Sequence, residues 1–140
     1  MSNLYYEGCI DAEFNGFDEN AIFKMNNGTY WLQEEYRYWY HYEYRPNATI
    51  TEENGRYILN VAGESVTVSR LDSVIESRID GKFDGWGKGK KYRLVNGQTW
   101  EQSRYKYEYK YAYRPEVLIC RIGGSYVMYV EGTHAEVRRV

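Results

Sequence analysis

Two stretches of this chain decide its fold: residues 36–46 read YRYWYHYEYRP, and residues 105–115 read YKYEYKYAYRP. In both stretches tyrosine occupies every second position, five times in a row. Successive side chains of a β-strand point to opposite faces, so this period predicts a strand whose five tyrosine rings leave one face. The residues between the tyrosines are mostly polar, and we therefore expect the opposite face to contact water.

The two tyrosine stretches belong to an internal duplication that covers most of the chain. Tyr36 and Tyr105 lie 69 positions apart. The same offset relates identical residues throughout both halves: Ile10 and Ile79, Phe14 and Phe83, Gly16 and Gly85, Trp31 and Trp100, Gln33 and Gln102, Val68 and Val137. An offset that survives every turn indicates two copies of one small fold. We place the copies at residues 8–71 and 75–140, and a domain of this size is near the lower limit for a stable core.

Each copy divides into short apolar stretches separated by glycine-bearing turns, and it has no helical period. Asn27-Gly28 and its counterpart Asn96-Gly97 are typical of a two-residue type I′ hairpin turn, in which both residues have positive φ. Alternation around this turn directs three side chains of each copy inward: Phe23, Met25 and Trp31, and Tyr92, Leu94 and Trp100. About five or six short strands per copy favour a strongly bent sheet. We therefore predict an all-β protein made of two tandem SH3-like barrels.

Composition and charge limit the classes of function. The net charge of −2 disfavours general nucleic-acid binding, which relies on an excess of positive charge. Cys9 and Cys120 are not shared between the copies and have no metal-ligand spacing, so we expect two free thiols and no metal or cofactor. No stretch is apolar over the length of a membrane span. We expect a cytoplasmic protein that is a monomer or a homodimer and does not bind membranes.

Four runs of the second copy resemble a family of small, uncharacterised bacterial proteins that share them as a signature. The runs are IDGKFDGW at residues 79–86, LVNGQTWEQ at residues 94–102, YKYEYKYAYRP at residues 105–115 and YVMYVEG at residues 126–132. The first copy departs from this signature at two positions, with Ala12 for the first glycine and Phe17 for the tryptophan. The resemblance implies a bacterial protein, and it implies no activity or catalytic residue.

The chain lacks the residue spacings of a catalytic site. Neither histidine is repeated, because His41 matches Lys110 and His134 matches Ser65, and no Ser-His-Asp or Cys-His arrangement surrounds them. The repeated acid Asp11, which matches Asp80, is explained as a turn-capping residue. We therefore expect a protein that is not an enzyme.

Two polar residues, Gln33 and Arg45, are kept in the second copy as Gln102 and Arg114. A structural interpretation is that the glutamine satisfies open backbone groups at a bend and that the arginine packs over aromatic rings. A functional interpretation places the two arginines at the rim of a tyrosine surface, where they bind a carboxylate or a phosphate.

The tyrosines themselves support two interpretations, which the sequence leaves open. The rings can form the core and the contact between the copies, or they can form a partly exposed ligand surface, because so small a domain hardly encloses five tyrosines and a tryptophan. Our first choice of function is a non-enzymatic module that binds a peptide or protein partner. A purely structural or assembly protein is the alternative, and a carbohydrate or single-stranded nucleic-acid ligand is less favoured. The residues expected to contact the ligand are Tyr38, Tyr40, Tyr42 and Arg45, and Tyr107, Tyr109, Tyr111 and Arg114.

Overall fold

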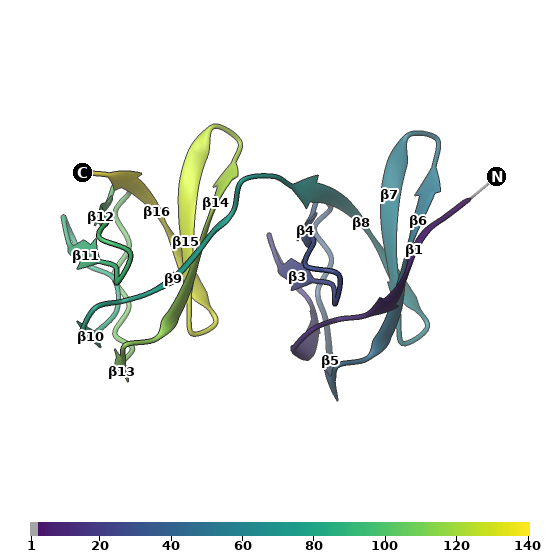
Figure 1. Cartoon of the computed structure of the whole chain (residues 1–140), viewed down its shortest axis with the longest axis horizontal. Coiled ribbons are helices and arrows are strands. Elements are labelled where there is room, and N and C mark those ends of the chain that lie inside the picture. The colour runs from purple at the N-terminus through teal and green to yellow at the C-terminus, as the bar shows by residue number, and fades with distance from the viewer. Residues whose placement is uncertain (1–2) are drawn as a thin grey trace. The chain divides into compact units, whose positions relative to one another are not determined.

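The chain consists of two units, Met1–Asp72 and Ser73–Val140, and the computed structural model describes residues 3–140 (Figure 1). The described residues form sixteen β-strands and no helix, so the all-β prediction is confirmed. Each unit has eight strands, so the predicted five or six strands per copy is wrong. The first unit begins before residue 8, the expected start of the first domain, because β1 (Asn3–Cys9) pairs with β6 (Asn47–Glu53). The junction between the units follows the end of β8 (Glu64–Leu71).

The first unit contains a curled, antiparallel six-stranded sheet in the order β1-β6-β7-β8-β4-β3, and a separate pair formed by β2 and β5. Its remaining strands are β2 (Glu13–Phe17), β3 (Ile22–Lys24), β4 (Tyr30–Gln33), β5 (Trp39–Tyr44) and β7 (Arg56–Val61). The end strands of the large sheet meet through a bridge between Ile10 and Met25, so the sheet curls around the side chains on its inner face.

The second unit repeats this order as β9-β14-β15-β16-β12-β11, with β10 and β13 as the separate pair. Its strands are β9 (Ile75–Arg78), β10 (Lys82–Phe83), β11 (Lys91–Arg93), β12 (Thr99–Gln102), β13 (Ala112–Tyr113), β14 (Glu116–Ile122), β15 (Ser125–Val130) and β16 (Thr133–Arg139). The register is also repeated, because Tyr57 lies opposite Val68 just as Tyr126 lies opposite Val137. Residues that lie 69 positions apart in the sequence therefore occupy equivalent positions in the two units.

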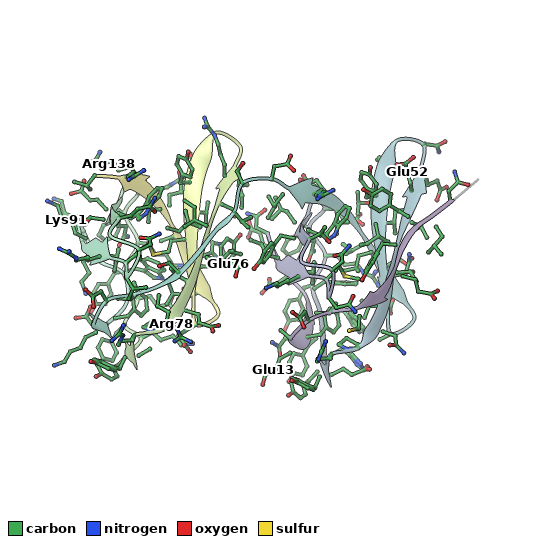
Figure 2. All side chains as sticks on the ribbon, viewed as in Figure 1. Glu13, Glu52, Glu76, Arg78, Lys91 and Arg138 are labelled. Atoms are coloured by element: carbon green, nitrogen blue, oxygen red, sulfur yellow. The ribbon has the colours of Figure 1, made fainter. Side chains whose placement is uncertain are left out.

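Each unit encloses a core of its own (Figure 2). The six side chains predicted to point inward are all buried: Phe23, Met25 and Trp31 in the first unit, and Tyr92, Leu94 and Trp100 in the second. Tyr57 packs edge-on against Trp31 with ring centroids 5.2 Å apart, and Tyr126 packs against Trp100 at the same distance. Burial of these large aromatic side chains supplies much of the apolar area that so small a domain needs.

The Asn-Gly hairpin differs in type from the prediction. Only the glycine has positive φ, at 87° for Gly28 and 91° for Gly97, so the predicted type I′ turn is wrong. The Gly28 N–H donates to the Met25 carbonyl at 2.9 Å, and the Met25 N–H donates to the Thr29 carbonyl at 2.9 Å. These bonds define a three-residue loop in which a left-handed glycine follows the turn. The asparagine instead accepts a hydrogen bond from the Thr29 N–H through its side chain, at 3.1 Å.

The predicted nine-residue tyrosine strand is wrong in its extent. In the first unit the strand covers only β5, and in the second unit it covers only β13, with a single bridge between Trp86 and Glu108 before it. We call residues 36–44 the first tyrosine segment and residues 105–113 the second tyrosine segment.

Candidate binding surface

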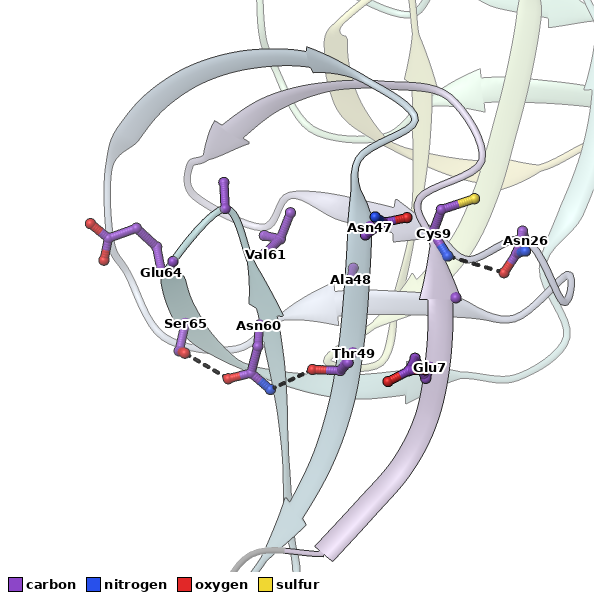
Figure 3. A pocket seen from close by; sticks show the side chains of 13 residues that line it. Glu7, Cys9, Asn26, Asn47, Ala48, Thr49, Asn60, Val61, Glu64 and Ser65 are labelled. Atoms are coloured by element: carbon purple, nitrogen blue, oxygen red, sulfur yellow. Dashed lines mark hydrogen bonds between the residues drawn. The ribbon is translucent and has the colours of Figure 1, made fainter.

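A shallow hollow of about 830 Å³ lies on the first unit, beside β1, β6 and β7 (Figure 3). Its polar side chains largely satisfy one another, because Asn60 donates to the Thr49 hydroxyl at 3.2 Å and accepts from the Ser65 hydroxyl at 2.7 Å. No group of His, Cys, Asp and Glu side chains within residues 3–140 is arranged to hold a metal ion. The hollow therefore offers no reactive or metal-ligating cluster.

The tyrosine segments form the other candidate surface. All ten tyrosine rings are exposed, at 52–74 % in the first segment and 54–75 % in the second. They therefore belong to neither core. The expectation that the intervening residues face water is wrong for most of them, which are partly buried: Arg37, Trp39 and His41 in the first segment, and Lys106, Glu108 and Ala112 in the second. The tyrosine face is the outer face of each segment.

The inner face of the first tyrosine segment packs on aromatic rings. The Trp39 ring lies 5.1 Å from the Phe17 ring, and His41 stacks on Trp39 at 5.1 Å with an interplanar angle of 4°. The Arg37 guanidinium lies 5.3 Å from the centre of the Phe17 ring. Long polar side chains can bury their stems in this way and keep their charged ends near water, which explains why a polar pattern was misleading.

Arg37 also ties the first segment to β8. Its Nη2 atom lies 2.7 Å from Glu64 Oε2, and its Nη1 atom donates to the Ser65 carbonyl. A charged donor that binds both a carboxylate and a carbonyl makes stronger hydrogen bonds than a neutral one. Both charged side chains remain more than a third exposed, so we treat the pair as a positioning contact of modest energy.

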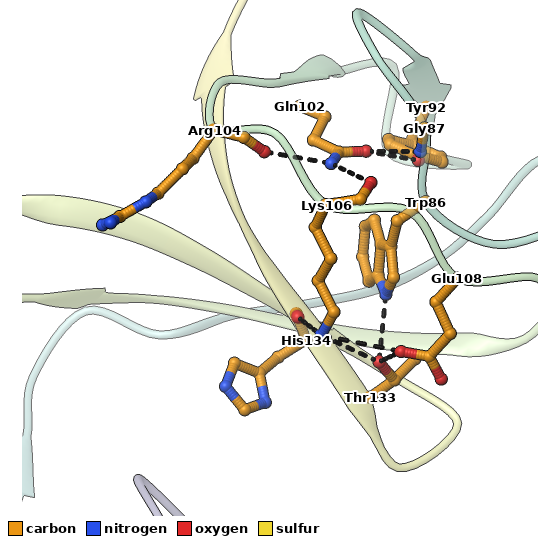
Figure 4. Close-up of polar contacts among 9 residues, drawn as sticks. All are labelled: Trp86, Gly87, Tyr92, Gln102, Arg104, Lys106, Glu108, Thr133 and His134. Atoms are coloured by element: carbon orange, nitrogen blue, oxygen red, sulfur yellow. Dashed lines mark hydrogen bonds and ion pairs between the residues drawn. The ribbon is translucent and has the colours of Figure 1, made fainter.

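The inner face of the second segment is held by a different network (Figure 4). Lys106 Nζ donates to the His134 carbonyl at 2.7 Å. The buried Thr133 hydroxyl accepts from the Trp86 indole N–H at 3.1 Å and donates to Glu108 Oε1 at 2.8 Å. The network joins the segment to the start of β16 and keeps the buried indole N–H paired.

A buried glutamine fixes the start of each segment. Gln33 is 1 % exposed, and its Oε1 atom accepts from the Asp18 N–H at 2.9 Å. Its Nε2 atom donates to the Glu35 carbonyl at 2.9 Å and to the Arg37 carbonyl at 3.0 Å. These carbonyls flank Tyr36. The structural interpretation of the glutamine is confirmed, because its amide satisfies backbone groups at the bend.

Gln102 makes the same contacts in the second unit. It accepts from the Gly87 N–H at 2.8 Å and donates to the carbonyls of Arg104 and Lys106 at 3.0 and 2.8 Å. Beside it, the Tyr92 hydroxyl donates to the Gly85 carbonyl at 2.8 Å. Burial raises the pKa of Tyr92 above its usual range, so the phenol stays a neutral donor.

A glycine lets each segment approach the neighbouring chain. A methyl group on Gly16 would lie 1.8 Å from the Trp39 carbonyl oxygen, and one on Gly85 would lie 1.9 Å from the Glu108 carbonyl oxygen. Both glycines have positive φ, at 97° and 103°. The backbone of the segment therefore crosses directly over the glycine. The constant offset showed that this glycine is repeated, but nothing in the sequence indicated that a chain crosses over it.

The backbone of the second tyrosine segment is open along one edge. Glu108 and Trp86 exchange backbone hydrogen bonds of 3.2 and 2.8 Å. Tyr107, Tyr109 and Tyr111 belong to no strand, and among residues 3–140 none of the backbone hydrogen bonds outside the strands involves them. Alternate residues of an extended chain direct their N–H and C=O groups to opposite sides, so the tyrosine backbone groups point away from Trp86. In the described part of the first unit, β5 likewise pairs with β2 alone.

The two repeated arginines end the segments in a left-handed turn. Arg45 has φ of 49° and Arg114 has φ of 50°. Their N–H groups donate to the carbonyls of Ala12 and Gly81, at 3.0 and 2.8 Å. The Arg45 guanidinium lies 3.2 Å from an Asp11 carboxylate oxygen, an ion pair where an aromatic contact was one expectation. Both side chains remain exposed beside the last tyrosine of their segment.

Comparison with family models, curated proteins and solved structures gives no match for this chain. Within the described residues there is no helix that is long and apolar enough to cross a membrane. The surface is therefore interpreted from its own geometry. The structure brings the eight predicted ligand residues to two similar surfaces, each made of alternating exposed rings, an open backbone edge and a terminal arginine.

Proposed function

We propose that the protein is a non-enzymatic interaction module in which each tyrosine segment binds an extended stretch of a protein or peptide partner. The observation that carries this proposal is the exposure of all ten tyrosine rings beside an open backbone edge. An unpaired edge is a template for a further strand, and aromatic rings supply contact area at little cost in conformational entropy. The partner strand gains backbone hydrogen bonds from the edge and side-chain contacts from the rings.

The frame beneath each segment supports this role. Gln33 and Gln102 hold the entrance of a segment, and Gly16 and Gly85 hold its centre against the neighbouring chain. A surface that is fixed before binding loses less freedom when the partner arrives.

We also infer that each unit is a small SH3-like barrel in a cytoplasmic bacterial protein. The curled six-stranded sheet and the bridge between its end strands support the barrel. Small barrels of this type commonly bind extended peptides on aromatic surfaces. The two free thiols, Cys9 and Cys120, support a reducing compartment.

Selection of peptides from a random display library tests the proposal. The full-length protein is immobilised, and the affinities of the selected peptides are measured by fluorescence anisotropy. A variant with serine at Tyr38, Tyr40, Tyr42, Tyr107, Tyr109 and Tyr111 should bind them at least ten-fold more weakly. Leu4→Ser is the control, because Leu4 is 62 % exposed and lies outside both segments. Peptides that bind the two variants equally well would contradict the proposal.

A further inference from the structure

The two units carry opposite net charges. The first unit, residues 1–72, contains 12 acidic and 5 basic residues and has a net charge of −7. The second unit, residues 73–140, contains 8 acidic and 13 basic residues and has a net charge of +5. The small net charge of the whole chain hides this contrast. Two units of similar fold therefore carry net charges of opposite sign, which favours attraction between unlike units of different copies of the chain.

The reversal of charge occurs at matched positions that flank the tyrosine segments. Glu35 precedes the first segment, and the matching Arg104 precedes the second. Glu13 pairs with Tyr44 across β2 and β5, and the matching Lys82 pairs with Tyr113 across β10 and β13. All four charged residues are exposed, and Figure 2 labels Glu13 at the lower end of the first unit. Apart from Arg45 and Arg114, which follow both segments, the first segment thus has an acid near each end, and the second has a base near each end.

The contacts of these residues leave their charges accessible. Glu35 accepts a hydrogen bond from the Thr67 N–H at 2.8 Å and remains exposed. Arg104 lies 3.1 Å from a Glu136 carboxylate oxygen, but its side chain is 80 % exposed. Exposed ion pairs of this kind are weak and exchange readily for a better partner.

From this complementarity we propose that the partner of each tyrosine segment is a second copy of the chain, in which the first segment of one copy pairs with the second segment of another. This inference rests on the proposed function. Antiparallel pairing of the two open edges brings the start of one segment to the end of the other. Glu35 then lies near Lys82 of the other copy, and Glu13 lies near Arg104 of the other copy. Tyrosines of the two segments become cross-strand neighbours on one face.

Pairing between two identical segments is disfavoured, because it brings like charges together at both ends. The contact is therefore heterologous, and each copy keeps one further segment for another contact. Such contacts form rings when their geometry closes and open chains when it does not. We expect oligomers whose mass rises with protein concentration and falls with added salt, since screening weakens contacts between exposed charges.

Charge reversal in the full-length protein tests the proposal by sedimentation velocity. The variant Glu13→Lys with Glu35→Lys gives two basic segments, and the variant Lys82→Glu with Arg104→Glu gives two acidic segments. Each should associate at least ten-fold more weakly than the wild type. An equimolar mixture of the two variants should regain the association, and circular dichroism of each variant alone should show that it keeps the β-sheet signal of the wild type. Glu52→Lys is the control, since Glu52 also matches a base, Arg121, but lies opposite Tyr57 at the end of β6 that is farther from the first tyrosine segment.

Three results would overturn the proposal: a wild-type protein that stays monomeric at all concentrations, double variants that associate like the wild type, or a mixture that does not associate. Binding of a fluorescent oligothymidylate by a monomeric wild-type protein would instead assign the basic segment to nucleic acid. Peptides that still bind the tyrosine segments of a monomeric protein would leave the proposed function intact and remove only the second copy as the partner.

Discussion

The two units hold their tyrosine segments with the same frame but fill the space beneath them differently. Both use a buried glutamine at the entrance and a glycine under the crossing. In the first unit the large ring beneath the segment is Trp39, which the segment itself supplies above Phe17. In the second unit it is Trp86, which takes the place of Phe17, while Glu108 takes the place of Trp39. The indole is thus supplied by the tyrosine segment in the first unit and by the chain opposite the segment in the second.

The polar contacts change with the indole. The cation is kept, since Arg37 matches Lys106, but its acidic neighbour moves from Glu64 on β8 to Glu108 on the segment. Glu64 is replaced by Thr133, whose hydroxyl then accepts from the indole. The comparison shows that both units keep the same backbone path for the segment. The side chains beneath it can differ, provided that several of them change together.

The largest loss of stability is expected from a substitution at the glycine over which the segment crosses, a feature that both units share. Gly85→Ala places a methyl group 1.9 Å from the Glu108 carbonyl oxygen, and neither backbone can move without losing the crossing. We expect the second unit to lose more than about 4 kcal/mol of unfolding free energy. Gly97→Ala is the control, because Gly97 has a similar φ of 91° but a methyl group added there would have no atom within 4 Å. Denaturant unfolding that gives similar losses for both variants would show that the crossing is not tight.

The glutamine is expected to have the next largest effect, and an equal one in both units. Gln102→Leu leaves the Gly87 N–H and the carbonyls of Arg104 and Lys106 without partners, which costs about 3 kcal/mol or more. Gln33→Leu should cost the same within about 1 kcal/mol, since it also loses one bond from a backbone N–H and two bonds to backbone carbonyls. Gln102 has in addition only a long contact of 3.5 Å from the Tyr92 hydroxyl. Unfolding curves of the two variants provide the measurement. A large difference between them would break the claim of a common frame.

A transplant of the first unit's residues sharpens the comparison. Trp86→Phe alone removes buried ring area and leaves the Thr133 hydroxyl without its indole donor, so we expect a loss of about 1–3 kcal/mol. Adding Glu108→Trp and Thr133→Glu restores the first unit's set. The triple variant should recover at least about 1 kcal/mol of that loss, because the effects of substitutions at residues in contact do not simply add. A triple variant that is no more stable than Trp86→Phe in denaturant unfolding would contradict the side-chain exchange.

A small effect is expected from an ion pair that only the second unit has. A hydrogen bond from Lys90 holds the pKa of Asp84 below its usual range, and the first unit has Asn15 at this position. A lowered folded-state pKa stabilises the unit above the carboxyl's unfolded pKa of about 3.9 and loses this contribution as pH falls further. Asp84→Asn should cost about 0.2–1 kcal/mol at neutral pH and nothing in strong acid. A pH-independent difference in unfolding free energy would refute the assignment.

The sequence predicted the parts of this fold that follow from periodicity. The constant offset anticipated the repeated strand order, and alternation anticipated buried Trp31 and Trp100. It could not decide which face of a tyrosine segment meets water. Arg37 and His41 are counted as polar, yet their planar groups lie over aromatic rings on the inner side. A two-class hydrophobic pattern cannot register such packing.

Other features required coordinates because they depend on contacts between distant residues. Arg45 and Arg114 have a left-handed backbone conformation, which is unusual for arginine. Their N–H groups donate to the carbonyls of Ala12 and Gly81, and the sequence near the arginines does not indicate these distant partners. The opposite charges of the units were hidden in the total, which alone argued against nucleic acid. This contrast did not need coordinates, because the predicted domain bounds at residues 71 and 75 already separate the two sets of charges.

The central claim is that the tyrosine segments are binding surfaces rather than scaffold, and the unfolding of two variants tests it most directly. Gly97→Val strains a left-handed backbone position and should cost about 1–3 kcal/mol. Tyr109 is 70 % exposed, and Tyr109→Ser should cost less than about 0.5 kcal/mol while it weakens association. Measured side by side, the tyrosine variant should melt close to the wild type and well above the glycine variant. A Tyr109→Ser protein as destabilised as Gly97→Val would contradict the account.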